Sequence, residues 1–229
     1  MQKIWFLVFL LSIIFISSKV YAIGDYELRE SRKCSNIFSY FEKKHNLPVN
    51  SLYSISLHET AKKHSRHNIL VVWPWTVMNN KEKKGYHFKT QNEAIGYAKM
   101  QFVSGNKNLD VGCMQINLKY HPDAFVSLDQ AFSPKSNIAY GAYFLNKNRE
   151  KLGSIEKAIG RYHSATEHLA VKYCRNISRI NQAMREYNNN LRKACYSSRV
   201  PIIYKKPKGP YNKGTKMNSI SKRSNRAML

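Results

Sequence analysis

The spacing of apolar residues changes twice along this chain, and these changes restrict its fold more than any other feature. Residues 34–66 carry apolar side chains at helical intervals, residues 69–110 begin with a β-branched and aromatic tract, and residues 111–195 return to helical spacing. The middle tract runs into a polar turn at residues 79–85 and then alternates again, as a small hairpin does. The pattern predicts a mainly α (α+β) domain with a small β-hairpin insert.

Local capping signals place several of the predicted helices. The sequence Thr90-x-x-Glu93 has the pattern of a capping box and opens an amphipathic helix. Ser136 and Ser154 are each expected to cap a further helix, because a serine side chain accepts a hydrogen bond from a free backbone N–H of the first turn. A long polar-amphipathic helix is predicted from Glu167 to Asn189.

The N-terminus has the pattern of an export signal. Lys3 precedes an apolar run from Ile4 to Ile16, and Val20-Tyr21-Ala22 fits a small-x-small cleavage site. The apolar run is short for a membrane span, so we predict a signal peptide over residues 1–22 and a periplasmic or secreted protein. An uncleaved N-terminal anchor is the alternative. The next segment, residues 23–198, is long enough for one hydrophobic core and short for two.

The formal net charge of +24 points to an anionic partner, either nucleic acid or a polymer such as a cell wall. Export argues against nucleic acid, and the abundance of Lys, Asn, Ile and Tyr also fits a drift in composition, so we predict no nucleic-acid partner. Residues 199–229 hold Lys and Arg without Asp or Glu, and we expect a basic disordered tail. This tail either contacts an anionic wall or membrane surface or is solvated without a function.

All four cysteines follow the predicted signal, at positions Cys34, Cys113, Cys174 and Cys195. An even number in an exported chain permits two disulfides with three connectivities that the sequence does not rank. For Cys113, which lies in an apolar segment, a buried free thiol is at least as consistent with the sequence as a disulfide. The cysteines form no CxxC pair, so nothing supports a zinc ribbon or a thioredoxin-like site.

The chain has 14 acidic residues, few enough to consider singly. Glu93 belongs to the capping box. Four glutamates beside lysines are expected on a solvated face, namely Glu42, Glu82, Glu150 and Glu156. Two acidic residues remain as candidates for chemistry, Glu59 and Asp110.

Glu59 continues a helical stripe that starts after Ser51. It follows Leu52 and Ile55 at the i, i+3, i+7 spacing of one helix face, so its carboxyl is directed toward the predicted core. A charged carboxylate is costly to bury there, and such a setting suits a general acid. The alternative is a glutamate at a helix end that faces water.

The pair His58-Glu59 also resembles the start of a zinc-binding HExxH helix. The second histidine of that motif would stand at position 62, which is Lys62, and His64 lies on another face of the helix. We therefore predict neither a metal site nor a cofactor.

The segment Gly112-Cys113-Met114-Gln115-Ile116-Asn117 is the most informative one. A glycine lets the backbone approach a ligand closely, and Gln115 and Asn117 offer the donors and acceptors that suit the hydroxyl and N-acetyl groups of sugars. A packed turn with capping amides is the alternative.

Four motifs in this order resemble the soluble lytic transglycosylase family of the lysozyme-like superfamily, over about residues 50–165. They are Glu59-Thr60, the segment from Gly112 to Asn117, the run from Asn137 to Leu145, and Ala158-x-x-x-Tyr162-His163-Ser164-Ala165. The tract from Trp73 to Gln115 is similar to a subgroup with an insert between the catalytic glutamate and the glycine motif. Two departures from the family pattern are Thr60, where the family usually has Ser, and His163-Ser164-Ala165, where it usually has Asn-Ala-Gly.

The resemblance implies a lysozyme-like helical fold and an enzyme that acts on peptidoglycan glycan strands, as a monomer and without a cofactor. Such an enzyme cleaves the β-1,4 bond between N-acetylmuramic acid and N-acetylglucosamine and forms a 1,6-anhydro ring. Glu59 would be the single catalytic acid and base. The substrate-binding residues would be Gly112, Met114, Gln115, Asn117 and Tyr162.

Several roles stay open. Trp73 and Trp75 are either sugar platforms or aromatic core, His163 is a second titrating group or a tolerated replacement, and Asp110 binds substrate or holds a turn. The first alternative function is a hydrolytic muramidase of the same fold with Asp110 as its second carboxylate. The second is a non-catalytic basic protein that binds the cell wall.

Overall fold

Seven helices and six short strands make up residues 26–197, the part of the chain that the computed structural model describes. In chain order they are α2 (Tyr26–Lys44), α3 (Ser51–Thr60), β1 (Lys62–Lys63), β2 (Leu70–Val71), β3 (Thr76–Asn79), β4 (Lys84–His87), α4 (Gln91–Val103), β5 (Leu109–Val111), β6 (Ile116–Asn117), α5 (Leu128–Ala131), α6 (Pro134–Leu152), α7 (Ile155–His163) and α8 (Glu167–Ser197). The predicted signal peptide and the predicted basic tail lie outside the described residues. The predicted mainly α fold is confirmed.

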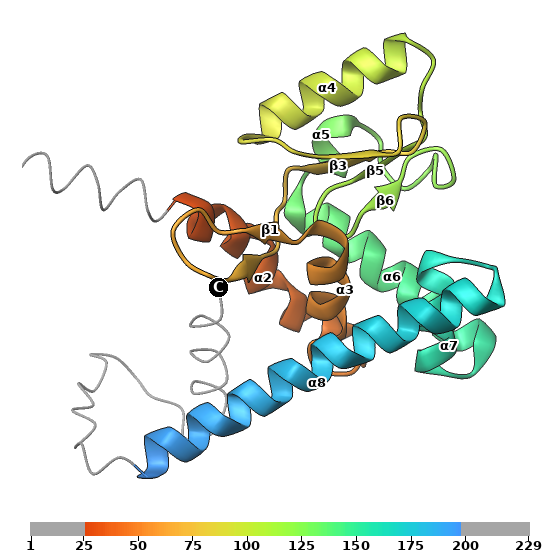
Figure 1. Ribbon diagram of the computed structural model, residues 1–229. Helices are drawn as coiled ribbons and strands as arrows, with labels where there is room; N and C mark the ends of the chain where they lie inside the picture. The colour runs from red at the N-terminus through yellow and green to blue at the C-terminus, as the bar shows by residue number, and fades with distance from the viewer. Residues whose placement is uncertain (1–25, 198–229) are drawn as a thin grey trace, which may run out of the picture.

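Five helices form the larger part of the molecule (Figure 1). Helices α2, α3, α6 and α7 pack together, and α8 runs across α3 and α7. Their shared core is built from apolar side chains of all five helices, including Phe38, Leu52, Ile55, Ile138, Leu145, Ala158 and Ile177. Burial of these side chains removes apolar surface from water and fixes the helices around α3.

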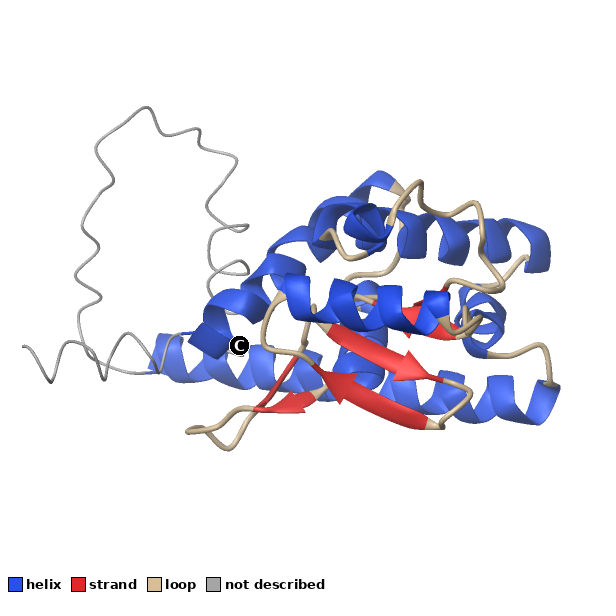
Figure 2. Cartoon of the chain, turned by 90° about the horizontal axis from the view of Figure 1, so that it is seen from above, coloured by secondary structure: helices blue, strands red, loops and turns tan. Residues whose placement is uncertain are grey.

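The smaller part is an antiparallel sheet with strand order β4-β3-β5-β6, whose strands are among those drawn in red in Figure 2. Strands β3 and β4 form the predicted hairpin, with Thr76 opposite His87. The apolar run from residue 69 to 78 is two strands, β2 and β3, rather than one, because Pro74 lies between them and cannot donate to a ladder. A second core joins this sheet to α4 and α5 through Trp73, Trp75, Val77, Ala94, Leu109, Val111 and Phe132.

The predicted caps are confirmed at two of three positions. Thr90 Oγ1 accepts a hydrogen bond from Glu93 N at 3.2 Å, and Ser154 Oγ accepts one from Lys157 N at 3.3 Å. The prediction for Ser136 is wrong, because α6 already begins at Pro134, whose fixed φ suits the first turn of a helix. Helix α8 begins at Glu167 as predicted but extends to Ser197.

Glu42 is buried, with 5% of its surface exposed, so its predicted place on a solvated face is wrong. Its carboxylate oxygens accept hydrogen bonds from Asn50 N at 3.0 Å and Leu52 N at 2.9 Å. These N–H groups belong to the start of α3 and have no partner within the helix. Burial raises the pKa of Glu42, and the backbone hydrogen bonds oppose that rise. The carboxylate thus anchors the helix that carries Glu59.

Across residues 26–197, none of the helices has the length and apolar character needed to cross a bilayer.

Candidate active site

Glu59 lies in the last turn of α3, where 21% of its side chain is exposed. Leu52 and Ile55, on the same helix face, are fully buried, as the stripe predicted. The hydroxyl of Tyr173 on α8 donates a hydrogen bond of 2.6 Å to Glu59 Oε1. The glutamate is therefore held at the surface end of a buried helix face, with one oxygen fixed and access to solvent retained.

Two histidines contact the ring of Tyr173. The His163 ring stacks on it with centroids 4.7 Å apart and planes at 1°, while His58 meets it edge-on with centroids 5.0 Å apart. His58 Nδ1 lies 3.8 Å from Glu59 Oε1. Burial raises the pKa of Tyr173 well above its ordinary value, and the charge of Glu59 and the hydrogen bond to it add to the rise. The phenol therefore stays protonated and remains a donor at neutral pH.

The segment from Gly112 to Asn117, called the glycine–amide turn below, makes the tight turn after β5 and continues into β6. Gly112 has a φ of 77°, and a Cβ at this position would lie 2.5 Å from Asn137 Nδ2. Asn137 is fully buried; its Nδ2 donates to Val111 O and Ala131 O, and its Oδ1 accepts from Met114 N at 2.7 Å. The turn needs glycine because Asn137 fills the space where a side chain would be.

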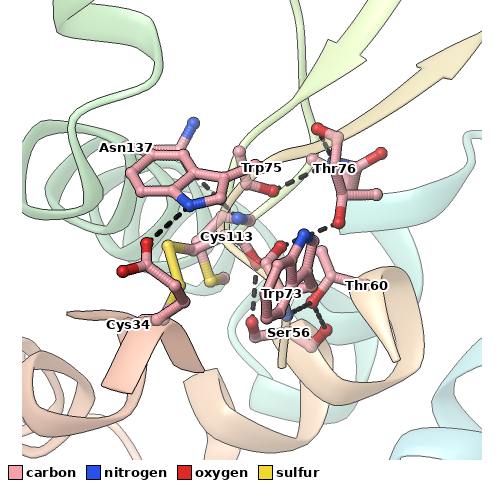
Figure 3. Close-up of a disulfide and its surroundings, with 12 residues drawn as sticks. Cys34, Ser56, Thr60, Trp73, Trp75, Thr76, Cys113 and Asn137 are labelled. Carbon is pink, nitrogen blue, oxygen red and sulfur yellow. Dashed lines mark hydrogen bonds between the residues drawn. A yellow bond between two sulfur atoms is a disulfide. The ribbon is translucent and has the colours of Figure 1, made fainter. Parts of the chain in front are cut away.

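A ring of hydrogen bonds joins this turn to the helix of Glu59 (Figure 3). Ser56 Oγ of α3 donates to Cys113 O at 2.6 Å. Thr60 Oγ1 donates to Ser56 O at 2.8 Å and accepts from Trp73 N at 3.1 Å. The ring closes through Thr76, whose Oγ1 donates to Trp73 O and whose carbonyl accepts from Gly112 N. Thr60, a departure from the family pattern, thus holds the turn and the helix in register.

A disulfide between Cys34 and Cys113 ties the same turn to α2, with the two Cα atoms 6.0 Å apart (Figure 3). A free buried thiol at Cys113, one of the two alternatives from sequence, is therefore wrong. Cys174 forms no disulfide within the described residues, and the side chain of Cys195 lies outside the part described.

Tyr162, at the end of α7, also contacts the turn. Its hydroxyl donates to Met114 O at 2.8 Å, and burial raises its pKa well above the ordinary value, with the charges of Glu59 and Asp110 adding to the rise. Gly141 leaves room for this contact, because a Cβ there would lie 2.8 Å from the Met114 side chain and 3.1 Å from the Tyr162 hydroxyl. Met114 itself is fully buried, so its side chain packs beneath Tyr162 instead of lining a surface groove.

The amides of Gln115 and Asn117 have internal partners. Gln115 has a φ of 47° and its Nε2 donates to Gly112 O at 2.9 Å and Thr76 O at 3.1 Å. Asn117 Nδ2 donates to Asp110 at 2.6 Å, while its Oδ1 accepts from two backbone N–H groups of the following turn. Both side chains are partly exposed. These hydrogen bonds agree with the alternative in which the two amides hold the turn.

Asp110 holds the sheet next to this turn. Its two oxygens accept hydrogen bonds from Asn117 Nδ2 and, at 2.9 Å, from Asn80 Nδ2. Burial raises the pKa of Asp110; the two amide hydrogen bonds oppose the rise, and the charge of Glu59 adds to it. A smaller effect in the lowering direction comes from the charge of His163.

Trp73 and Trp75 are core residues, each 2% exposed, so the alternative that they are sugar platforms is wrong. Their indole N–H groups donate to Phe88 O and to Glu30 Oε2, each at 2.7 Å.

A cavity of about 190 Å³ lies between α4 and the segment before α5. Phe102, Leu118 and Phe125 are among the residues that line it, and Glu59 does not line it. Among residues 26–197, no group of three His, Cys, Asp or Glu side chains is placed to hold a metal ion.

Two features of this site are not predicted from the sequence. One is Tyr173 as a partner of Glu59, and the other is the support that Asn137 gives to the turn. Tyr173 and Ile177 share one apolar stripe of α8, which marks Tyr173 as buried but not as a partner of Glu59. Asn137 begins one of the four family motifs, yet the sequence has no signal for its burial beyond that position.

Residues 91–184 match the family model of the transglycosylase SLT domain. Glu59 and the helix that carries it precede the matched segment, whereas the glycine–amide turn, Asn137, Tyr162 and Tyr173 lie within it. No curated protein and no solved structure matches the chain. The match over residues 91–184 is consistent with the lytic transglycosylases of the lysozyme-like superfamily and supports a transglycosylase-type, peptidoglycan-lytic function in general.

Proposed function

We propose that this protein is an exported lytic transglycosylase that cleaves the β-1,4 bond between N-acetylmuramic acid and N-acetylglucosamine, with Glu59 as its single acid and base. The observation that carries the proposal is the setting of Glu59. It is partly exposed, hydrogen-bonded by a protonated tyrosine, and joined through Ser56 to the glycine–amide turn of the matched domain. A lone carboxyl in such a position can give a proton to a substrate and take one back.

The reaction needs only one carboxyl. Glu59, protonated at Oε2, gives its proton to the glycosidic oxygen as the bond from C1 of the muramic sugar to that oxygen breaks. The N-acetylglucosamine end leaves with a free 4-hydroxyl group. The muramic C6 hydroxyl then attacks C1 and its proton passes to Glu59, which closes the 1,6-anhydro ring and restores the acid. No water is consumed, so no second carboxylate has to activate one.

Tyr173 supports both halves of this cycle. Its hydrogen bond to Oε1 fixes the rotamer of Glu59 and leaves Oε2 for the substrate. When the carboxylate forms, the same hydrogen bond becomes charge-assisted and stronger. The fixed rotamer and the stronger hydrogen bond would let Glu59 give up and regain its proton while its side chain stays in one position.

The glycine–amide turn and Tyr162 would receive the sugar beside Glu59. Gln115 and Tyr162 are partly exposed, whereas Gly112 is buried and shapes the turn through its φ of 77°. Met114 and Asn117 would support the turn from its inner side. Met114 is buried, and the amide of Asn117 is hydrogen-bonded to Asp110 and to the next turn. Asp110 then serves as a support of the turn.

Export is part of the proposal and rests on the sequence of residues 1–22, with residues 23–198 as the enzyme. A disulfide within the described residues supports an oxidising compartment such as the periplasm or the exterior. We propose a monomer, with the basic tail of residues 199–229 free to contact an anionic wall or membrane surface.

The decisive experiment digests purified sacculi with the wild-type protein and with Glu59→Gln, and identifies the products by mass spectrometry. Anhydro-ended muropeptides from the wild type, and none from the variant, are expected. Glu186→Gln, an exposed glutamate of α8, is the control for the loss of one charge. Reducing ends would instead identify a hydrolytic muramidase, and lysis by Glu59→Gln would show that another group is the acid. Binding of both variants to sacculi separates loss of chemistry from loss of affinity.

A further inference from the structure

His163 stands where the family pattern has a different residue, and its contacts give it a role. It ends α7, it is exposed, and its ring lies parallel to that of Tyr173, at 1° and 4.7 Å between centroids. Tyr173 in turn is only 2% exposed. The imidazole therefore covers one face of the tyrosine and separates it from water.

A second histidine also contacts Tyr173. His58 meets the Tyr173 ring edge-on at 5.0 Å, and its Nε2 lies 3.5 Å from Asn176 Nδ2, one turn along α8. Tyr173 is thus held by three elements: α8, which carries it, α3 through His58, and α7 through His163. Its hydroxyl donates to Glu59 Oε1 at 2.6 Å.

We propose that His163 is a positioning residue of the lytic reaction: by stacking on Tyr173 it fixes the hydroxyl that orients Glu59. This inference rests on the proposed function of Glu59. The property that matters is the flat ring, because stacking holds the phenol in place whether or not the imidazole carries a proton. A planar, non-titrating side chain should therefore replace it.

The test compares His163→Ala with His163→Phe. The alanine variant should lower kcat for release of anhydro-muropeptides by roughly three- to tenfold, the range that one aromatic contact spans, and should leave KM nearly unchanged. The phenylalanine variant should restore most of kcat. His168→Ala, an exposed histidine of α8 outside the site, is the matched control and should behave as wild type. The thermal midpoint of His163→Ala should fall by only about 2–4 °C, as expected for the loss of one aromatic contact, and the other two variants should stay near the wild type.

Two results would overturn the proposal. Wild-type kcat in His163→Ala means that the stack has no role. A phenylalanine variant as slow as the alanine variant means that a ring nitrogen is required, which would make His163 a titrating group.

A second readout needs no activity and separates this proposal from the function of Glu59. In protein labelled with ¹³C-tyrosine, the ring signals of Tyr173, assigned by their loss in Tyr173→Phe, should move when His163 becomes alanine and stay near their places when it becomes phenylalanine. Unmoved signals in the alanine variant would refute the stack even if lysis depends on Glu59. Moved signals in a protein without lytic activity would contradict the proposed function of Glu59 and support the contact between His163 and Tyr173.

Discussion

The hydroxyl of Tyr173 donates a hydrogen bond of 2.6 Å to Glu59 Oε1 across a sequence separation of 114 residues. The contact joins α3, which precedes the matched SLT segment, to the part of α8 that lies within it. Burial, followed by the charge and hydrogen bond of Glu59, raises the pKa of Tyr173, so the phenol stays protonated and donates at neutral pH. The acid and its donor therefore form one unit built from distant parts of the chain.

Replacing Tyr173 by Phe tests this unit. The variant keeps the ring in the core and loses the hydrogen bond to a group that becomes charged, an interaction worth about 1.5–3 kcal/mol. We expect kcat to fall roughly tenfold to a hundredfold with a small change in KM. Kinetics on purified glycan strands check it, with Tyr120→Phe as the control, since Tyr120 is 69% exposed. Wild-type kcat in Tyr173→Phe would show that the contact does not serve the reaction.

The position of Glu59 could be predicted because its signal is local. Leu52, Ile55 and Glu59 lie within two turns of one helix, and helical spacing alone puts them on one face. The hairpin and the cap at Thr90 are likewise set by neighbouring residues, and both are confirmed.

The surroundings of Glu59 could not be predicted in the same way. Tyr173 reaches Glu59 only after α8 packs across α3, and its sequence position says no more than that it is buried. Glu42 was misjudged because its lysine neighbours indicate a solvated face, whereas the demand for an acceptor at the start of α3 lies eight residues away. Long-range packing decides both cases, and periodicity does not report it.

Gly112→Ala should damage the glycine–amide turn. An alanine would require a φ of 77°, which costs about 1–2 kcal/mol, and its Cβ would lie 2.5 Å from Asn137 Nδ2. We expect the free energy of unfolding to fall by about 2–4 kcal/mol and lysis to be lost. Gly105→Ala is a matched control, because Gly105 has a φ of 79° with nothing within 4 Å of the added Cβ. Urea denaturation of both variants compares them, and equal losses would mean that Asn137 does not restrict the turn.

The disulfide between Cys34 and Cys113 should support both stability and lysis. The cross-link spans 79 residues, and its removal from the double variant Cys34→Ser, Cys113→Ser should lower the free energy of unfolding by about 2–4 kcal/mol. Lysis should weaken, because the turn that follows Cys113 loses its tie to α2. Cys174→Ser, which removes a cysteine outside the disulfide, should leave both unchanged. Treatment of the wild type with dithiothreitol should reproduce the double variant, and a double variant as stable as the wild type would contradict the prediction.

Glu27 should make the protein sensitive to acid. Burial alone would raise its pKa, but hydrogen bonds from Lys62 Nζ and Ser65 N lower it from 4.5 to about 2. A carboxyl with a lowered pKa in the folded state stabilises the fold above its unfolded pKa of 4.5 and loses that effect as the pH falls toward about 2. Glu27→Gln should therefore be less stable than wild type by about 1–2 kcal/mol at neutral pH, and the difference should close between these pH values.

Urea denaturation at a series of pH values measures this difference, with Glu186→Gln as the control for charge. If the difference in the free energy of unfolding between wild type and Glu27→Gln stays constant as the pH falls, the carboxylate of Glu27 does not stabilise the fold.

Asp110→Asn separates transglycosylation from hydrolysis within one site. Asp110 accepts hydrogen bonds from Asn80 and Asn117 on its two oxygens, and its pKa responds to the charge of Glu59. If its task is to hold the turn, asparagine keeps one acceptor and loses about one hydrogen bond, so lysis should fall no more than roughly tenfold. A hydrolytic muramidase that relies on Asp110 to activate water or to attack the sugar would lose lysis almost completely. Product analysis completes the test: anhydro ends from the variant support a reaction carried by Glu59 alone, whereas loss of all products with the fold intact would make Asp110 the second catalytic carboxylate.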